Sequence, residues 1–352
     1  MALLALLVGL GSMKRTSPPA ATVKRFEVTL PPSAQLFGGL TNWLAVSPDG
    51  KYFAYRASYA SGGWRLYLRP LSELKATPIP GSEDGINPFF SPDGAWLAFF
   101  RGGELKKVAI SGGAAVTICQ AAEGRGATWG PDDTIVFGVA ANQGLRRVRA
   151  SGGKAEELTR VDSSQKEMSH RWPEFLPGGQ EVLFAIQGVS ADWDMARIAV
   201  LSLKTGKWRT LIEGGTNPHY SPTGHILYAR AGLLMAAPFD LDRLEITGPA
   251  APVLEDVFMN RASGNAHAAF SPEGTLVYIA GESAEAPRDL VWVDRKGQAR
   301  PVGVTAAGFE QPSLSPDGKR VAVHIGPPSD DIWVYDLGRG TLTRLTFQPG
   351  ED

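Results

Sequence analysis

Polar side chains recur at two fixed positions in this chain, and these residues are the best suited to bind a ligand. The positions lie two and four residues before a turn phrase that is repeated along the sequence. Because side chains alternate between the two faces of a strand, residues at both positions would share one face. The polar residues at these positions are Asn87, Glu174, Asn217, His219, His267 and Gln311. They predict a polar channel mouth that holds a small ligand or ordered water.

The same residues do not predict a metal centre. His219 and His267 belong to different repeats, and no two histidines of the chain stand at His-x-x-x-His spacing. Metal sites built from one segment usually show such local spacing. We therefore predict neither a metal nor a cofactor.

No nucleophile with a catalytic partner is recognisable. The single cysteine, Cys119, lies in an apolar run, which favours a buried and inert thiol. The chain has no Gly-x-Ser-x-Gly turn of the serine hydrolases, and Ser111 and Ser151 each precede two glycines in a turn between strands. The sequence predicts no catalytic residue and no enzyme activity.

The turn phrase has the form Ser-Pro-Asp-Gly and occurs in seven versions, 39 to 50 residues apart. They begin at Ser47, Ser91, Gly130, Leu176, Ser221, Ser271 and Ser315. Proline presets φ for the first corner, aspartate caps the turn, and glycine accepts a positive φ. We assign a structural role in turns to Asp49, Gly50, Asp93, Gly94, Asp317 and Gly318.

Each phrase follows a bulky apolar residue and precedes short runs that are rich in β-forming residues. About four such runs per repeat of roughly 40–50 residues are typical of a β-propeller blade. The sequence therefore predicts an all-β propeller, most simply with seven four-stranded blades, over residues 23–352. Residues 24–30 alternate and are expected to form a strand that closes the ring. The end of the chain is compatible with a complete ring of seven or with a larger one.

The repeated phrase resembles that of the TolB-like, WD-type propellers of bacteria, over most of the chain. Three stretches are also similar to the propeller region of bacterial membrane-anchored serine/threonine kinases: residues 66–71, residues 89–94 with 103–108, and residues 169–179. That resemblance implies an extracytoplasmic sensor. The chain has no Gly-rich phosphate loop of kinase spacing, no His-Arg-Asp and no Asp-Phe-Gly, so no kinase activity is expected from it.

Residues 1–22 consist of an apolar leader followed by a linker rich in proline and alanine. The leader is compatible with a poor signal peptide, with the remnant of a membrane anchor, or with a segment of no consequence. The anchor interpretation agrees with the kinase resemblance. It predicts a periplasmic or membrane-anchored location in a bacterium.

The chain has 35 basic and 36 acidic residues, a net charge of −1, and 43% hydrophobic residues. Such a balance gives no bulk basic field that would favour nucleic acid. The expected partner is a protein or a small ligand at one face of the propeller. We hypothesise a non-catalytic sensor propeller; a periplasmic TolB-like scaffold and the gating propeller of a prolyl-oligopeptidase-like peptidase are the alternatives.

Overall fold

The computed structural model describes residues 25–28, 30, 41–59, 62–139, 142–190, 192–281, 290–304, 309–325 and 331–347. Residues 1–22, the predicted leader and linker, lie outside this part. The described residues form antiparallel sheets and no α-helix, with two short 3-10 helices, η1 (Ser163–Gln165) and η2 (Trp193–Met195). No helix in this part of the chain is long and apolar enough to cross a membrane.

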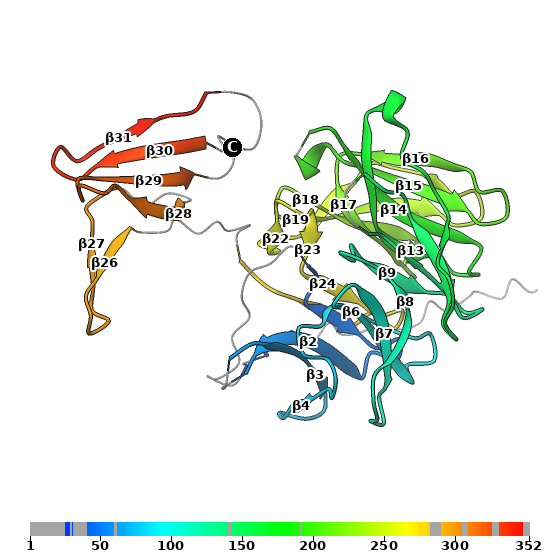
Figure 1. The fold of residues 1–352 in the computed structure, drawn as a ribbon. Helices are drawn as coiled ribbons and strands as arrows, with labels where there is room; N and C mark the ends of the chain where they lie inside the picture. Colours follow the sequence, from blue (N-terminus) through cyan, green and yellow to red (C-terminus); the bar gives the residue numbers. More distant parts are fainter. Residues whose placement is uncertain are drawn as a thin grey trace, which may run out of the picture.

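Five consecutive sheets each contain at least four strands in chain order, as expected for propeller blades (Figure 1). The first sheet has strands β1 (Leu44–Val46), β2 (Tyr52–Ser58), β3 (Trp64–Pro70) and β4 (Thr77–Pro78). The second has β5 (Ile86–Phe90), β6 (Trp96–Arg101), β7 (Glu104–Ala109) and β8 (Val116–Gln120). The third has β9 (Ala127–Trp129), β10 (Thr134–Phe137), β11 (Arg146–Arg149) and β12 (Glu156–Glu157).

The fourth sheet has β13 (Glu167–Phe175), β14 (Glu181–Gly188), β15 (Arg197–Ser202) and β16 (Trp208–Glu213). The fifth has β17 (Thr216–Ser221), β18 (His225–Arg230), β19 (Leu233–Asp240), β20 (Glu245–Ile246) and β21 (Ala251–Leu254), which pairs with β19. A sixth unit has the hairpin β22 (Met259–Asn260) and β23 (Asn265–Ala266), followed by the pair β24 (Ala268–Phe270) and β25 (Leu276–Tyr278).

The first strands of these units surround a common axis. Strands β1, β5, β9, β13 and β17 contact one another in this order, β17 contacts β23, and β24 contacts β1. The series of contacts therefore returns to its start after six units. This closed arrangement is the β-propeller that the repeat predicts.

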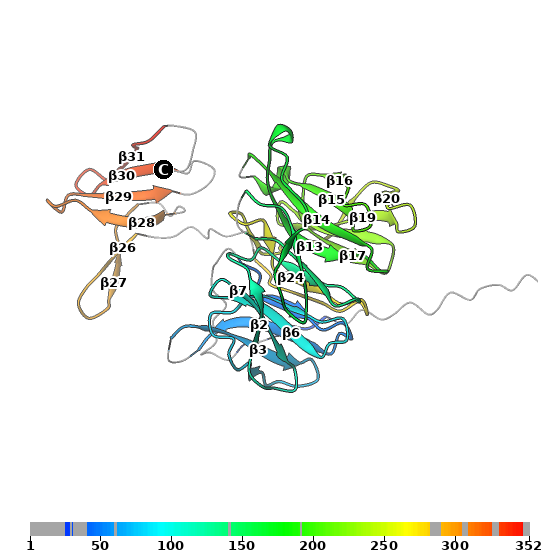
Figure 2. The same ribbon diagram turned by 45° about the vertical axis from the view of Figure 1, so that its right-hand side comes forward.

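The seventh repeat forms a separate sheet of β28 (Phe309–Leu314), β29 (Arg320–Ile325), β30 (Asp331–Asp336) and β31 (Thr341–Arg344). The hairpin β26 (Val291–Val293) and β27 (Ala299–Pro301) lies beside it. Figures 1 and 2 both show these strands, in orange and red, apart from the ring. The repeat thus folds into the expected blade, whereas a ring of seven blades stays a prediction.

The bulky residue before each turn phrase packs between neighbouring sheets of the ring. Phe90 joins the core of the first two sheets, Trp129 that of the second and third, and Tyr220 that of the fourth and fifth. Leu314 occupies the same position in the seventh repeat but is 49% exposed, because no sheet covers it. Its exposure shows that the interblade contact, not the strand itself, buries this position.

The turns have the geometry that their sequence favours. The hydroxyl of Ser91 donates to Asp93 at 2.5 Å, and Asp93 accepts the amide of Ala95 at 3.0 Å. Both hydrogen bonds lower the pKa of Asp93, the hydroxyl more than the amide. Gly94 has a φ of +69°. The turns at Ser47 and Ser315 repeat these contacts through Asp49 with Gly50 and Asp317 with Gly318.

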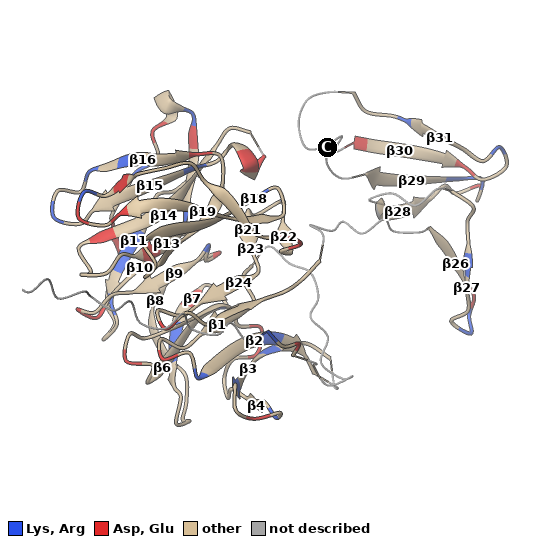
Figure 3. Ribbon diagram, turned by 180° about the vertical axis from the view of Figure 1, so that it is seen from behind, with Lys and Arg blue, Asp and Glu red and all other residues tan. Residues whose placement is uncertain are grey.

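Charged residues are distributed over the ring with both signs interspersed (Figure 3). They lie mainly on outer strands and in connections. The spaces between the sheets of the ring are apolar, with six clusters of buried residues that follow the blade interfaces. A seventh cluster belongs to the separate sheet β28–β31 and the hairpin beside it. The part of the ring most suited to binding is therefore its axis.

Candidate ligand-binding channel

A channel with a volume of about 180 Å³ runs between the inner strands of the ring. Its wall combines apolar side chains with polar groups and comes from all six units. The main apolar side chains are Pro88, Phe89, Phe90, Pro173, Pro218 and Phe270. Of the predicted binding residues, Asn87, Glu174, Asn217 and His219 line this channel.

Glu174 and His219 form the polar centre of the wall. Glu174 lies on β13 and His219 on β17, and one carboxylate oxygen of Glu174 contacts Nδ1 of His219. The other carboxylate oxygen accepts the amide of Tyr220 at 2.8 Å. The imidazole stacks on Phe270 of the sixth unit, with ring centroids 4.3 Å apart and an interplanar angle of 18°. Three adjacent blades thus fix the orientation of this pair.

The contact determines which ring nitrogen of His219 is available. An ionised carboxylate only accepts hydrogen bonds, so Nδ1 of His219 carries a proton and donates it in a hydrogen bond to Glu174. In the neutral imidazole Nε2 is then an acceptor, and it has no hydrogen-bond partner among the residues that the structure describes. The side chains of Glu174 and His219 remain 25% and 17% exposed, so solvent reaches them.

Asn87 and Asn217 line the channel, but their amide groups serve the fold. Oδ1 of Asn87 accepts the amide of Asn42 at 2.6 Å, and its Nδ2 donates to the carbonyl of Gly124 at 2.7 Å. Asn87 therefore connects the first, second and third units. Oδ1 of Asn217 accepts the amide of Ala266 at 3.1 Å, which connects the fifth unit to the sixth. These contacts use the groups that a ligand would need.

A β-bulge explains why simple alternation did not predict the direction of these asparagine side chains. Residues Asn87, Trp172, Asn217 and Gln311 have φ values of 49°, 52°, 50° and 47°, and each lies at a register shift of its strand. The bulge turns the side chain away from the regular alternation. The sequence carries a signal for it, since a proline follows each of the four residues, and proline within a strand marks bulges.

His267 and Gln311 are not among the residues that line the channel. His267 is fully buried, with its ring centroid 3.9 Å from that of Trp43 and 5.0 Å from that of Phe258. Burial lowers its pKa to about 3, so it is neutral. Gln311 lies exposed on β28, which stands apart from the ring. The sequence showed the position of Gln311 in the repeat, but it did not show that this repeat lies apart from the ring.

The tip of the hairpin β22–β23 connects the sixth unit to the fourth and fifth. The carbonyl of Ser263 accepts hydrogen bonds from Arg171 and Trp172, both at 3.3 Å. The carbonyl of Gly264 accepts the hydroxyl of Thr216 at 3.0 Å. Ser263 and Thr216 have no solvent exposure. The hairpin tip is therefore a buried contact between blades.

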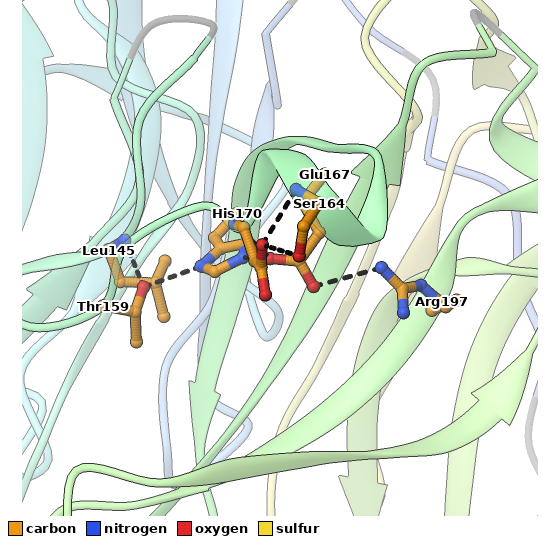
Figure 4. A network of polar contacts seen from close by, with 7 residues as sticks. Leu145, Thr159, Ser164, Glu167, His170 and Arg197 are labelled. Carbon is orange, nitrogen blue, oxygen red and sulfur yellow. Dashed lines mark hydrogen bonds and ion pairs between the residues drawn. The ribbon is translucent and has the colours of Figure 1, made fainter.

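A second polar network, shown in Figure 4, has the residue types of a catalytic triad but a structural role. Thr159 contacts Nδ1 of His170 at 2.7 Å, and Nε2 of His170 contacts Glu167 at 3.1 Å. Arg197 donates to Glu167 at 3.1 Å, and the amide of Leu145 donates to the hydroxyl of Thr159 at 2.8 Å. Every polar atom of the His170 ring is thus satisfied.

The network is inaccessible to substrate. Side chains of His170 and Glu167 are 0% and 4% exposed. Burial raises the pKa of Glu167, but the hydrogen bonds from His170 and the Asp162 amide and the charge of Arg197 outweigh it, so the pKa lies below its usual value. The network fastens the connection between the third and fourth sheets.

The single cysteine and the metal-ligating residue types of the described chain offer no further site. Cys119 is buried, and burial raises the pKa of its thiol to about 11, which keeps it protonated and inert. Among the residues that the structure describes, no three His, Cys, Asp or Glu side chains converge to hold a metal ion.

Known structures share this fold. A putative TolB from Agrobacterium tumefaciens is 17% identical, with 68% of this chain and 90% of that chain covered and a TM-score of 0.50. An oligogalacturonate lyase from Vibrio parahaemolyticus is 14% identical, with 86% and 89% covered and a TM-score of 0.47. The Cps50 (Swd1) β-propeller domain from Myceliophteria thermophila is 12% identical, with 90% and 88% covered and a TM-score of 0.43.

At this identity such likeness concerns the fold alone. No family model matches the chain, and no curated protein matches it.

Proposed function

We propose that this chain is a non-catalytic binding propeller, which holds a ligand in its channel at the Glu174–His219 pair. The observation that carries the proposal is the partly exposed, oriented carboxylate–imidazole pair beside the apolar side chains of the channel wall. Binding sites commonly combine an apolar wall with a few oriented polar groups. The ligand class that fits is an apolar group with one N–H or O–H donor for Nε2 of His219.

Indole and N-methylindole test this proposal, because they differ in one N–H donor. We expect ligand-observed NMR to show that the protein binds indole roughly 2- to 10-fold more tightly, the range of one net hydrogen bond. The variant His219→Phe should keep an apolar channel and lose the preference. His225→Phe, on β18 and outside the channel lining, should behave like wild type.

Two results would contradict the proposal. One is the absence of saturable binding of either fragment at the channel. The other is an unchanged preference for indole in His219→Phe, because the donor would then have another partner.

We further propose that residues 23–352 serve as the extracytoplasmic sensor of a bacterial membrane-anchored kinase, with residues 1–22 as tether and linker. The similarity of residues 66–71, 89–94 with 103–108, and 169–179 to the propellers of such kinases supports this role. A TolB-like scaffold in the periplasm is the alternative. Reading the gene upstream of Met1 tests the choice: an in-frame kinase domain and apolar span supports the sensor, and a stop codon directly before Met1 contradicts it.

A further inference from the structure

Arg171 is a buried cation without an anionic partner. The residue is 6% exposed, and its Nε donates to the hydroxyl of Ser169 at 2.8 Å. One terminal nitrogen donates to the carbonyl of Ser263 at 3.3 Å, and the guanidinium lies 4.9 Å from the ring centre of Trp193. These contacts satisfy part of the guanidinium. It forms no ion pair with any carboxylate in the described part of the chain.

A second guanidinium approaches from the adjacent blade. The amide of Trp172, next to Arg171, donates to the carbonyl of Arg125 at 3.0 Å, so the two arginines come from paired backbones. Nε of Arg125 is buried and has no hydrogen-bond partner in the described structure. The side chain of Arg125 is 13% exposed, and its single carboxylate neighbour, Glu123, is 3.6 Å away and 65% exposed.

This arrangement is short of negative charge. Burial, followed by the charge of Arg125, lowers the pKa of Arg171 to about 10, although the charge of Glu123 acts in the opposite direction. Two desolvated like charges are unfavourable unless an anion lies between or beside them. Glu123 supplies part of this charge, but at 3.6 Å it forms no hydrogen bond with Arg125, and solvent weakens an ion pair with a carboxylate that is 65% exposed. The missing component is an acceptor that both guanidinium groups can share.

We propose that Arg125 and Arg171 form a binding site for a carboxylate-bearing ligand between the third and fourth blades. The site differs from the Glu174–His219 pair, since it selects an anion and its two arginines come from the third and fourth blades. Guanidinium groups bind carboxylates through paired N–H donors, and the planar fork gives the geometry its specificity. The incoming carboxylate takes the position beside Arg125 that Glu123 now approaches.

Acetate titration at constant ionic strength tests the site, with tryptophan fluorescence as the readout, because Trp193 lies against Arg171. We expect saturable quenching in wild type. Arg125→Gln should weaken acetate binding roughly tenfold or more, as expected for lost hydrogen bonds to a charged group. Glu123→Gln should strengthen binding, since it removes the competing carboxylate. The variant Arg101→Gln, an exposed arginine of β6 that pairs with Glu83, is the matched control and should bind like wild type.

Three outcomes would overturn the proposal: no saturation with acetate, equal binding in Arg125→Gln and wild type, or weaker binding in Glu123→Gln. Inorganic phosphate serves as a second probe in the same titration. Phosphate binding that is tenfold tighter than acetate binding would contradict the carboxylate assignment. Arg125 is partly exposed, so its substitution keeps the test possible even if variants of the buried Arg171 do not fold.

Discussion

His267 makes the stability of this protein depend on pH at the scale of one residue. Its folded pKa of about 3 is far below the ordinary value of 6.5, because it is buried among aromatic rings. The unfolded state therefore binds a proton between these values that the folded state does not bind. The stabilisation that comes from burying neutral His267 is therefore complete above pH 6.5. As the pH falls from 6.5 towards 3, the unfolding free energy decreases by roughly 1.4 kcal/mol per pH unit.

We predict that His267→Phe loses this pH dependence. The phenyl ring keeps the contacts with Trp43 and Phe258 and has no proton to bind. Urea unfolding between about pH 4.5 and 6.5 should give a steeper loss of unfolding free energy with acid for wild type than for the variant. Equal slopes would mean that His267 is protonated in the folded protein. All other titrating groups are common to both proteins.

For single residues, the sequence identified which positions near the axis carry polar side chains, but it did not reveal in which direction those side chains point. Glu174 and His219 were predicted to share a face, and the structure brings them into contact. Asn87 and Asn217 were predicted beside them, but the left-handed backbone directs their amides to neighbouring main chain instead. The buried arginines Arg125 and Arg171 were not identified, because sequence does not reveal which charges lack a partner.

At the scale of the element, the geometry of the repeated turn predicts the stability cost of replacing its glycine. Gly94 has a φ of +69°, while a Cβ there would have only Pro48 nearby, at 3.7 Å. Substitution to alanine therefore tests backbone strain without a clash, and we expect Gly94→Ala to lose about 1–2 kcal/mol of unfolding free energy. Gly188→Ala, at the end of β14 with no left-handed φ and open space, should change stability by less than about 0.5 kcal/mol. Equal losses in urea unfolding would contradict the turn assignment.

Elements were predicted well where one repeat unit determines them. The seven phrases with their flanking strands appear as expected, because turn chemistry and alternation are local. The hairpin β22–β23 was not predicted, since it occurs in one repeat alone and has no counterpart to reveal it. Residues 25–28 and 30 do not form the predicted strand, although Val28 and Leu30 pack against the cluster shared by the first and sixth units.

At the scale of the whole molecule, the hairpin tip depends on one glycine. A Cβ at Gly264 would lie 2.1 Å from the indole of Trp193, and its φ is +70°. Gly232 has a φ of +78°, and a Cβ there would have no atom within 4 Å. The substitution Gly232→Ala therefore costs only the strain of a left-handed backbone, without a steric clash. We predict that Gly264→Ala is less stable than Gly232→Ala by about 1–3 kcal/mol, the cost of overpacking. Equal stability of the two variants would show that Trp193 yields without cost.

The tip of the hairpin β22–β23 also couples blades that are not neighbours in the ring. Ser263 and Gly264, of the sixth unit, accept hydrogen bonds from residues of the fourth and fifth blades. A movement of the fourth blade relative to the sixth would therefore have to break the hydrogen bonds to Ser263, so this tip acts as a brace across the ring.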